Sequence, residues 1–348
     1  MNITVITDLY PVLENEKKTP RTIYDFVQGW KELGHGVKVI KPNFILNSFL
    51  RKKPFYKSET YNDVENLNFW TPFWGTLKNE SALNSDVIIA HMPSGIIYAN
   101  RLGLNIPLVA GVHVSDIEVL TNPIYAIYFK SEVEKAYKNA YRIACRSDVL
   151  RKKFLELYPE YEEKTFVAYS GIKPEYIIKR EWKPKEKIKV LTCANLIKRK
   201  NIDKLILACN GLENVELTIV GDGEEYKNLQ KISHKNVGFL GHLPHEKVLE
   251  QMRLADIFVL PSENETFGMV YLEAMASGCI TVGLENEGID GIIKNGENGY
   301  LCRLNNIKQT LETIIYSDKQ NENLTSAYNT IQNFTQEKAC LNYLGNIT

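Results

Sequence analysis

The chain has 348 residues, 44% of them hydrophobic and 24% charged, and its 42 basic residues are balanced by 42 acidic ones. This mix indicates a globular protein with a sizeable core, and the length exceeds the ~250–300 residues at which a single core usually stops growing, so two domains are expected. The zero net charge argues against a nucleic-acid-binding protein, because such proteins draw most of their affinity from clustered cations.

The first half of the chain alternates short apolar, β-branched runs with segments of helical periodicity, which is typical of buried parallel strands joined by helices. An amphipathic helix is expected over 20–33, ending at Gly34. The opening segment, MNITVITDLY, lacks the basic start and long apolar stretch of a secretion signal, so we expect a cytoplasmic protein. Strands are expected near 2–6, 37–40, 86–90, 107–112, 141–145 and 165–169.

The second half repeats this alternation after a polar segment, KREWKPKEK at 179–187, which predicts an exposed linker. The sequence therefore predicts an α/β protein with two Rossmann-like, doubly wound domains, 1–180 and 181–332. Because ligands of such sheets bind beyond the carboxyl ends of the strands, a shared site is expected in a cleft between the two domains. The second set of strands is expected near 188–194, 215–220, 236–240, 256–260 and 279–283.

The most informative segment is PSENETFGMVYLEAMASG, from Pro261 to Gly278, which follows an expected strand and turns into a helix. Glu265 lies in the loop before that helix, where Gly268 lets the backbone approach a ligand and the first helical amides favour phosphate. Glu273 lies within an otherwise apolar helix, where an ionised carboxylate needs a partner such as a ribose diol. A capped helix with one exposed glutamate is the alternative.

This segment resembles the E-x7-E motif of retaining GT-B glycosyltransferases of family four, with Glu265 and Glu273 as its two acids. The resemblance implies that Glu265 lies beside the donor sugar with a catalytic role, and that Glu273 holds the nucleotide ribose. It also implies that backbone amides of this segment contact donor hydroxyls and phosphate. The residues expected to supply them are Phe267, Gly268, Met269 and Val270.

The segment LTCANLIKRKNIDKLILA resembles the G-R-L-x-x-x-K-G turn of the same family, whose cations bind the donor diphosphate. Lys200 matches the lysine and is expected to stabilise the leaving group. Asn195, which is also expected to contact the donor, stands where the family usually has arginine. Arg199 or Lys198 is therefore left to supply the missing charge. Asn201 replaces the final glycine. A solvated basic run is the alternative.

Two further turns follow expected strands of the second domain. Gly221 and Gly223 lack the third glycine of a dinucleotide-binding motif, so a structural turn is expected there. The turn Gly241, His242 and Leu243 resembles the family's turn near the donor base. His242 could equally be an ordinary loop residue.

In the first domain, PLVAGVHVSDIEVL ends a strand at His113, where the family commonly has a histidine that faces the donor sugar. His113 is therefore expected to be catalytic, with a core or capping histidine as the alternative. Arg146 is expected either in the cleft or on the surface. The family's paired-glycine loop is replaced by YPVLENEKKTPRT, where Lys17, Lys18 and Arg21 face either an anionic acceptor or solvent.

The segment FLRKKPFYK at 49–57, followed by Trp70, Phe73 and Trp74, could rest on an anionic membrane that carries a lipid-linked acceptor, or form an ordinary surface. The location expected is thus cytoplasmic, with the inner face of the membrane as an option. At the other end, FTQEKACLNYLGNIT lies in a helix expected over 333–348, and it resembles the GT-B helix that crosses back to the first domain.

No D-x-D motif occurs, and the histidines, acids and scattered cysteines have no metal-ligand spacing. We therefore expect no metal and no cofactor, and protein groups must neutralise the departing nucleotide. With the resemblance, this predicts a retaining hexosyl- or N-acetylhexosaminyltransferase that moves a sugar from a nucleotide-diphosphate donor to a hydroxyl of a sugar or lipid-linked sugar acceptor. Bacterial surface polysaccharide or glycoconjugate assembly is the expected setting.

Two other classes of protein fit the same scaffold, because a fold does not fix a function. One is a nucleotide-sugar epimerase or a sugar phosphorylase. The other is a noncatalytic nucleotide-sugar-binding protein, against which the presence of Glu265 and Lys200 argues.

Overall fold

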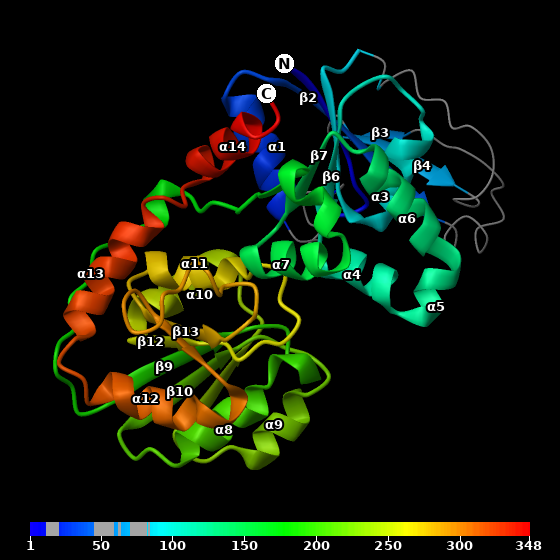
Figure 1. Cartoon of the computed structure of the whole chain (residues 1–348). Coiled ribbons are helices and arrows are strands. Elements are labelled where there is room, and N and C mark those ends of the chain that lie inside the picture. Colours follow the sequence, from blue (N-terminus) through cyan, green and yellow to red (C-terminus); the bar gives the residue numbers. More distant parts are fainter. Residues whose placement is uncertain (12–20, 45–58, 62–63, 70–81, 83) are drawn as a thin grey trace. The chain divides into compact units, whose positions relative to one another are not determined.

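The computed structural model describes residues 1–11, 21–44, 59–61, 64–69, 82 and 84–348 (Figure 1). These residues divide into two compact units, one of Met1–Ser170 with Ala339–Thr348 and one of Gly171–Lys338. Each unit is built on one sheet whose strands are connected by helices on both faces. The predicted α/β class with two Rossmann-like domains is confirmed.

The sheet of the first unit has the strand order β3-β4-β2-β1-β5-β6-β7-β8 and is parallel except for the β3–β4 pair. Every strand predicted for this half occurs, and β3 and β4 were not predicted. β1 pairs with both β2 and β5, so the strand order reverses its direction between β1 and β5. The strands are β1 (Asn2–Ile6), β2 (Gly36–Phe44), β3 (Glu59–Tyr61), β4 (Val64–Phe69), β5 (Val87–Ala90), β6 (Leu108–Val112), β7 (Arg142–Cys145) and β8 (Thr165–Val167).

Helices cover both faces of this sheet, and the C-terminal helix is one of them (Figure 1). The ring of Tyr343 on α14 packs edge-on against Phe26 and Trp30 of α1, with centroid separations of 5.3 and 5.2 Å. The predicted return of the last helix to the first domain is therefore present. The helices are α1 (Thr22–Glu32), α3 (Met92–Arg101), α4 (Val114–Thr121), α5 (Pro123–Tyr125), the π-helical turn η2 (Ala126–Lys130), α6 (Ser131–Asn139), α7 (Asp148–Leu157), η3 (Pro159–Lys164) and α14 (Gln336–Gly345).

The second unit has a parallel sheet with the order β11-β10-β9-β12-β13-β14. Helices α8, α9 and α12 pack together, as do α10, α11 and α13 (Figure 1). The elements are η4 (Pro174–Tyr176), β9 (Ile188–Cys193), η5 (Lys198–Lys200), α8 (Ile202–Asn210), β10 (Val215–Val220), α9 (Tyr226–Ile232), β11 (Val237–Gly241), α10 (His245–Leu254), β12 (Ile257–Val259), α11 (Met269–Ala276), β13 (Ile280–Leu284), β14 (Tyr300–Cys302), η6 (Leu304–Asn306), α12 (Ile307–Ile315) and α13 (Gln320–Ile331).

The polar segment 179–187 has no helix or strand, but it is fastened to the second unit. Arg180 donates to the carbonyl of Ala255 at 2.6 Å, and both Arg180 and Lys185 form ion pairs with the buried Asp256. Along the chain, the boundaries between the compact units therefore fall at 170/171 and 338/339. The sequence had predicted domain boundaries at 180/181 and 332/333.

Candidate functional site

The second sheet reverses its strand order between β9 and β12, because β10 and β11 lie on one side of β9 while β12 and β13 lie on the other. Open α/β sheets bind their ligands beyond the carboxyl ends of the strands at such a reversal. The loops that follow β9 and β12, residues 194–201 and 260–268, are therefore the place to look for a site. These loops carry the residues that the sequence singled out.

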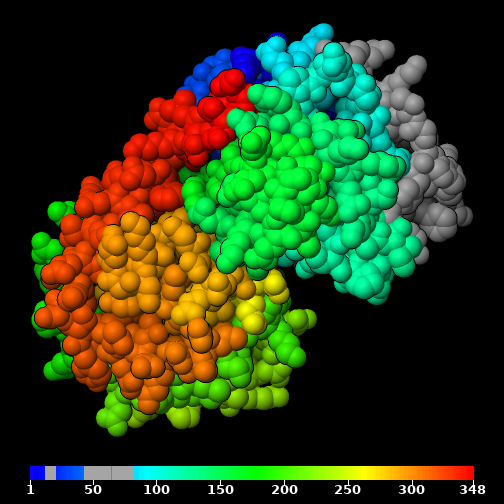
Figure 2. Space-filling model, viewed as in Figure 1, coloured from blue at the N-terminus to red at the C-terminus, as the bar shows by residue number. Residues whose placement is uncertain are grey.

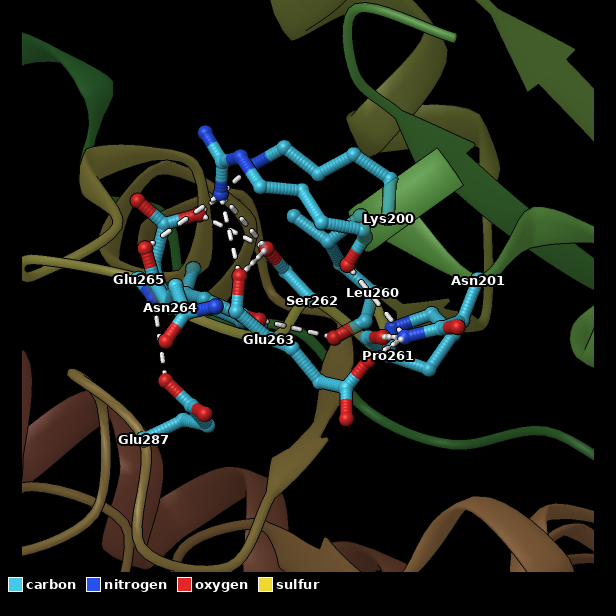
Figure 3. Close-up of polar contacts among 11 residues, drawn as sticks. Lys200, Asn201, Leu260, Pro261, Ser262, Glu263, Asn264, Glu265 and Glu287 are labelled. Atoms are coloured by element: carbon cyan, nitrogen blue, oxygen red, sulfur yellow. Dashed lines mark hydrogen bonds and ion pairs between the residues drawn. The ribbon is translucent and has the colours of Figure 1, made fainter. Parts of the chain in front are cut away.

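Lys200 and Glu265 come together at this point (Figure 3). Lys200 Nζ lies 2.6 Å from Glu265 Oε2, and the two side chains are only 10% and 16% exposed. Ser262 Oγ donates to the same carboxylate oxygen at 3.0 Å. The two residues predicted to act on the leaving group and the sugar thus form a largely desolvated ion pair, a contact that the sequence did not predict.

Arg199 and Asn201 hold the two loops together, and Figure 3 shows Asn201 beside Pro261. Arg199 Nη1 donates to the carbonyl oxygens of Glu263 and Asn264, at 3.1 and 3.3 Å, and Asn201 Nδ2 donates to the carbonyl oxygen of Pro261 at 3.0 Å. Arg199 is therefore engaged in loop structure, which weakens its case as a substitute for the family arginine. Asn195, at the position of that arginine, is exposed.

Asn201 stands where the family has glycine, and its backbone conformation explains why the replacement is tolerated. Its backbone has φ 51°, in the left-handed region. Glycine enters this region without strain, and asparagine is among the side-chain-bearing residues that enter it most readily. The turn therefore keeps its conformation, and the amide side chain adds the bond to Pro261.

Gly268 begins α11 in a conformation with φ 81°. A Cβ at this position would lie 2.4 Å from the ring of Tyr271, so a side chain is excluded. The next two residues, Met269 and Val270, start the helix without a side-chain cap, and Phe267 before them is buried. This arrangement suits an anion at the helix start, because the first amides of a helix lack intrahelical acceptors.

The loop after β13, residues 285–291, supports the Glu265 loop and was missed by the sequence analysis. Glu287 Oε2 accepts from the backbone amide of Glu265 at 2.9 Å (Figure 3). A Cβ on Gly288 would lie 2.6 Å from Phe267 N and 2.7 Å from Glu265 O, so glycine permits this close approach. In the sequence, Glu287 and Gly288 appear only as an acid and a glycine after a strand. They belong to no motif, so the sequence analysis did not identify them.

Gly288→Ala is expected to destabilise the second unit by about 1–3 kcal/mol, as overpacking usually does. The added methyl group would push the 285–291 loop away from the backbone that carries Glu265. The fall in melting temperature is measured by calorimetry. Gly238→Ala is the matched control, because a Cβ there has no neighbour within 4 Å. Equal melting temperatures for the two variants would contradict the packing argument.

Glu273 is paired within the protein. Its Oε1 lies 2.8 Å from His245 Nε2, and the two side chains are 16% and 51% exposed. His245 begins α10, and its ring also packs against Tyr176, with a centroid separation of 5.8 Å. The partner of this half-buried carboxylate within the protein is thus a histidine. Its Oε2 accepts no hydrogen bond from the residues that the structure describes.

The remaining turns of this edge are built by backbone contacts. A Cβ on Gly221 would lie 1.8 Å from Ala194 O, and one on Gly223 would lie 2.4 Å from Leu196 O, so both glycines serve packing. Gly241 has φ 67°, and its carbonyl accepts from Gly221 N at 2.8 Å. His242 is exposed and Leu243 is half-buried at the start of the α10 segment. Their predicted place near a donor base stays a prediction.

In the first unit, His113 is buried at the end of β6 and caps α4. Its Nε2 lies 3.0 Å from His91 Nδ1, and His91 Nε2 in turn lies 3.3 Å from the hydroxyl of Tyr343. The backbone amide of His113 donates to Asp116 Oδ2 at 2.9 Å. The capping alternative for His113 is therefore real, and it is compatible with a further role for the ring.

Two other basic residues of the first unit, Arg146 and Arg21, make contacts within the protein. Arg146 is buried, so the surface alternative is wrong; it donates to the carbonyl of Ala168 at 2.6 Å and lies over the ring of Phe26. Arg21 stacks on Tyr24 at 4.4 Å. The predictions for Lys17, Lys18, 49–57, Trp70, Phe73 and Trp74 fall outside the described residues.

Burial lowers the pKa of His113 to about 3, and the Arg146 charge adds to this effect. Burial, together with the neighbouring His113 and Arg146, also holds the pKa of His91 well below its usual range. In the opposite sense, burial raises the pKa of Asp116 to about 7. Near neutral pH, both imidazoles are therefore uncharged.

We expect the first unit to lose stability as the pH falls below about 6.5, because the unfolded chain then protonates both histidines while the folded one does not. Asp116 opposes this loss, since the folded state takes up its proton from about pH 7 downward. Asp116→Asn removes this opposing effect. The free energy of unfolding should then fall more steeply with decreasing pH, by up to roughly 1.4 kcal/mol per pH unit. Urea unfolding measures both slopes when it is followed by tryptophan fluorescence in a protein whose Trp70, Trp74 and Trp182 are replaced by phenylalanine, so that Trp30 alone reports on the first unit. Parallel curves would count against this account.

In the part of the chain that the structure describes, no three His, Cys, Asp or Glu side chains gather as a metal site. No helix of that part has the length and apolar character needed to cross a membrane. A cavity of about 1070 Å³ lies at the amino ends of β10 and β11, lined by residues such as Glu216 and Val237. It is on the wrong edge of the sheet for a ligand site of this fold.

The chain resembles known proteins over nearly its whole length. Two family models match consecutive parts of it: Glycosyltransferase Family 4 matches residues 19–176, and Glycosyl transferases group 1 matches residues 175–333. An uncharacterized glycosyltransferase of Methanocaldococcus jannaschii is 28% identical over 66% of this chain and 64% of its own length. N-acetyl-alpha-D-glucosaminyl L-malate synthase of Bacillus anthracis is 28% identical over 65% of this chain and 62% of its own length. The chain thus spans less than two thirds of either relative.

Solved structures share the fold. HepE of Anabaena, in complex with UDP, superposes with a TM-score of 0.75 at 18% identity, covering 100% of this chain and 99% of that one. Sucrose-phosphate synthase from Thermosynechococcus elongatus gives a TM-score of 0.73 at 16% identity, covering 100% and 98%. With the family matches, these likenesses lead to one conclusion: the chain belongs to the group 1 glycosyltransferases and has the GT-B fold.

Proposed function

We propose that the protein is a retaining glycosyltransferase that moves a hexosyl or N-acetylhexosaminyl group from a nucleotide-diphosphate donor to a hydroxyl of a sugar or lipid-linked sugar acceptor. The observation that carries the proposal is the ion pair of Lys200 and Glu265 at the strand reversal of the second sheet, with Nζ and Oε2 2.6 Å apart. A cation and an acid held together beyond strand ends suit a ligand with a phosphate end and a hydroxylated end.

The chemistry begins at the bond between the anomeric carbon of the sugar and the terminal phosphate oxygen. As this bond breaks, negative charge gathers on the departing nucleoside diphosphate. We assign the stabilisation of that charge to Lys200 and to the first amides of α11, at Met269 and Val270, because a held cation and the free amides of a helix start are preorganised partners of an anion. The acceptor oxygen forms its bond on the face that the diphosphate vacates, and its proton passes to the departing phosphate.

In this scheme Glu265 orients the sugar and does not form a covalent intermediate. Its Oε2 is already occupied by Lys200 and Ser262, and its loop is held by Glu287. His113 is the candidate for contact with the transferred sugar. Since its pKa is lowered to about 3, it serves as a neutral hydrogen-bonding group and not as an acid.

The donor base is proposed only as a class. A similar protein of Corynebacterium glutamicum is a GDP-mannose-dependent alpha-mannosyltransferase, 29% identical over 48% of this chain and 41% of its own length, whereas HepE was solved with UDP. Gly241, His242 and Leu243 are the proposed neighbours of the base. A role in bacterial surface polysaccharide or glycoconjugate assembly, in the cytoplasm at the inner face of the membrane, stays a prediction.

Release of nucleoside diphosphate from a panel of UDP- and GDP-sugars, with and without candidate acceptors, tests the proposal. A transferase releases the nucleotide in proportion to acceptor, and proton NMR of the product reads retention at the anomeric carbon. Interconversion of donor sugars without release would instead identify an epimerase, and sugar 1-phosphate formation or consumption a phosphorylase. Nucleotide-sugar binding without any turnover would leave a binding protein.

Turnover is expected to continue unchanged in EDTA, because Lys200 and the α11 amides supply the positive charge that a metal would otherwise provide. Initial rates are compared before and after dialysis against the chelator. Loss of turnover that magnesium or manganese restores would contradict a metal-independent mechanism.

A further inference from the structure

Two histidines of the first unit are buried side by side at the carboxyl ends of neighbouring strands. His91 follows β5 and His113 follows β6. Their rings meet edge to face with centroids 5.2 Å apart, and His113 Nε2 lies 3.0 Å from His91 Nδ1. A Cβ on Gly111 of β6 would lie 2.1 Å from that Nδ1 atom, so glycine makes room for the His91 ring.

The C-terminal helix contacts this pair through the other ring nitrogen of His91. Helix α14 forms surface of the first unit beside the N-terminal part of the chain (Figure 2), and it turns Tyr343 into the interior. The Tyr343 hydroxyl lies 3.3 Å from His91 Nε2, and the two rings are 6.2 Å apart between centroids. Tyr343, His91 and His113 thus form one hydrogen-bonded row, the histidine row.

The positions of the protons in the histidine row follow from its end at α4. The side chain of His113 accepts from the backbone amide of Asp116, in the capping box that begins α4. An amide N–H can only donate, so the ring nitrogen that faces it carries no proton. Because Nε2 is engaged with His91, this bare nitrogen is Nδ1. A neutral imidazole has one proton, and in His113 that proton is therefore on Nε2.

The same reasoning fixes the next two groups of the row. His113 Nε2 donates to His91 Nδ1, which must then be bare, so the His91 proton is on Nε2 and is donated to the Tyr343 oxygen. The reversed arrangement would put a proton on His113 Nδ1, where it would face the Asp116 amide as a second donor. The oxygen of Tyr343 is therefore the acceptor that completes the histidine row.

All three members of the row are uncharged near neutral pH. Burial is the main cause: it lowers the pKa of both histidines, which nearby Arg146 lowers further, and it raises the pKa of Tyr343. Asp116, the acid beside the pair, accepts from the backbone amide of His113 through Oδ2, and burial raises its own pKa to about 7. A second proton on His113, which would turn Nδ1 into a donor, is thus disfavoured.

We infer that Tyr343 and His91 are positioning residues, which hold His113 in the Nε2–H tautomer so that Nδ1 stays an acceptor for a hydroxyl of the transferred sugar. The inference rests on the sugar contact of His113 that is part of the proposed function. The Asp116 amide leaves room for this contact, because it also donates to the carbonyl oxygen of His113 at 3.1 Å and keeps that partner when a hydroxyl takes its place at Nδ1.

Nitrogen-15 NMR of the histidine rings tests the tautomers in the full chain, which has six histidines. Two-bond proton–nitrogen spectra distinguish a bare ring nitrogen from a protonated one, and spectra of His91→Asn and His113→Asn assign the signals. Both rings should be in the Nε2–H form, with no titration between about pH 8 and 5.5. An Nδ1–H form of His113 in the parent protein would overturn the inference.

Tyr343→Phe tests what the row does for catalysis. Loss of the oxygen leaves the His91 Nε2 proton without its acceptor, so an Nδ1–H signal of His113 should appear. We expect kcat to fall about tenfold, the effect of one hydrogen bond, with nucleoside-diphosphate affinity unchanged because the nucleotide contacts are assigned to the second unit. Tyr158→Phe is the matched control: it removes a hydroxyl that donates to Glu134 in the same unit, and should change neither kcat nor the tautomers.

His91→Asn provides a second test, because its side-chain oxygen can take the place of Nδ1 and accept from His113 without Tyr343. Tyr343→Phe should therefore reduce kcat about tenfold in the parent but less than about twofold in the His91→Asn background. Equal losses in the two backgrounds, or a fall in kcat with both tautomers unchanged, would show that Tyr343 acts through packing alone and would overturn the inference.

Donor consumption by the parent protein separates these outcomes from failure of the proposed function. The expected tautomers, and their reversal in Tyr343→Phe, in a protein that transfers no sugar would sink the transferase and leave the tautomer assignment standing. Sugar transfer by a protein with the opposite tautomers would sink this inference alone.

Discussion

Lys200→Ala is expected to reduce turnover at saturating donor by on the order of a hundredfold or more, the usual effect of losing a preorganised contact to developing charge. The position of the family arginine is an exposed asparagine, Asn195, and Arg199 is engaged with loop carbonyls. Lys200 therefore carries more of the charge on the departing diphosphate than a lysine beside an arginine would. Initial rates of nucleotide release measure the effect.

Lys198→Ala is the control, because Lys198 is an exposed cation two positions away on the same turn. Near-normal rates in the Lys200→Ala variant would remove Lys200 from leaving-group stabilisation.

Glu273→Ala is expected to weaken nucleoside-diphosphate affinity by about 1.5–3 kcal/mol, the range for hydrogen bonds to a charged group, which is roughly a tenfold to hundredfold change in Kd. His245 holds Oε1 of this carboxylate at 2.8 Å. That bond fixes the carboxylate, so its other oxygen is oriented to accept from a ribose hydroxyl. Titration calorimetry with UDP and GDP measures the change.

Glu246→Ala is the matched control, since Glu246 is an exposed acid next to His245 in the first turn of α10. It should leave nucleotide affinity unchanged. A folded Glu273→Ala protein that binds nucleotide as tightly as the parent would exclude this carboxylate from the ribose site.

The strands that the sequence predicted are those whose residues are mostly apolar, as expected of buried strands. β5 and β13 are wholly buried, and their runs VIIA and ITVGL are almost entirely apolar. The strands that were missed are weaker in this respect. β4 carries the polar run VENLNF, and β3 and β14 have three residues each at the ends of their sheets. A polar strand such as β4, or a strand of three residues at an edge, carries little apolar pattern, so periodicity does not reveal it.

Some residues of the site could be predicted from a local motif, whereas their contacts with distant parts of the chain could not. Glu265, Gly268 and Glu273 belong to one loop-helix segment, so a motif could mark them. Their partners come from elsewhere in the chain: Lys200 is 65 positions from Glu265 and His245 is 28 positions from Glu273. Only the folded chain brings these together. Asn201 is a residue whose role the motif alone obscured. It replaces the family glycine, yet the structure shows that it keeps the left-handed turn.

The position of α14 in the first unit has a consequence for the order in which the protein can be assembled on the ribosome. Tyr343 packs among Phe26, Trp30 and Phe166, and its hydroxyl reaches His91, 252 positions earlier. Domains generally fold as they emerge, the N-terminal one first. Here the N-terminal unit must wait with an open apolar face until residues 339–348 have been synthesised, after all of the second unit. The second unit, although its synthesis starts later, is thus the first that can close its core.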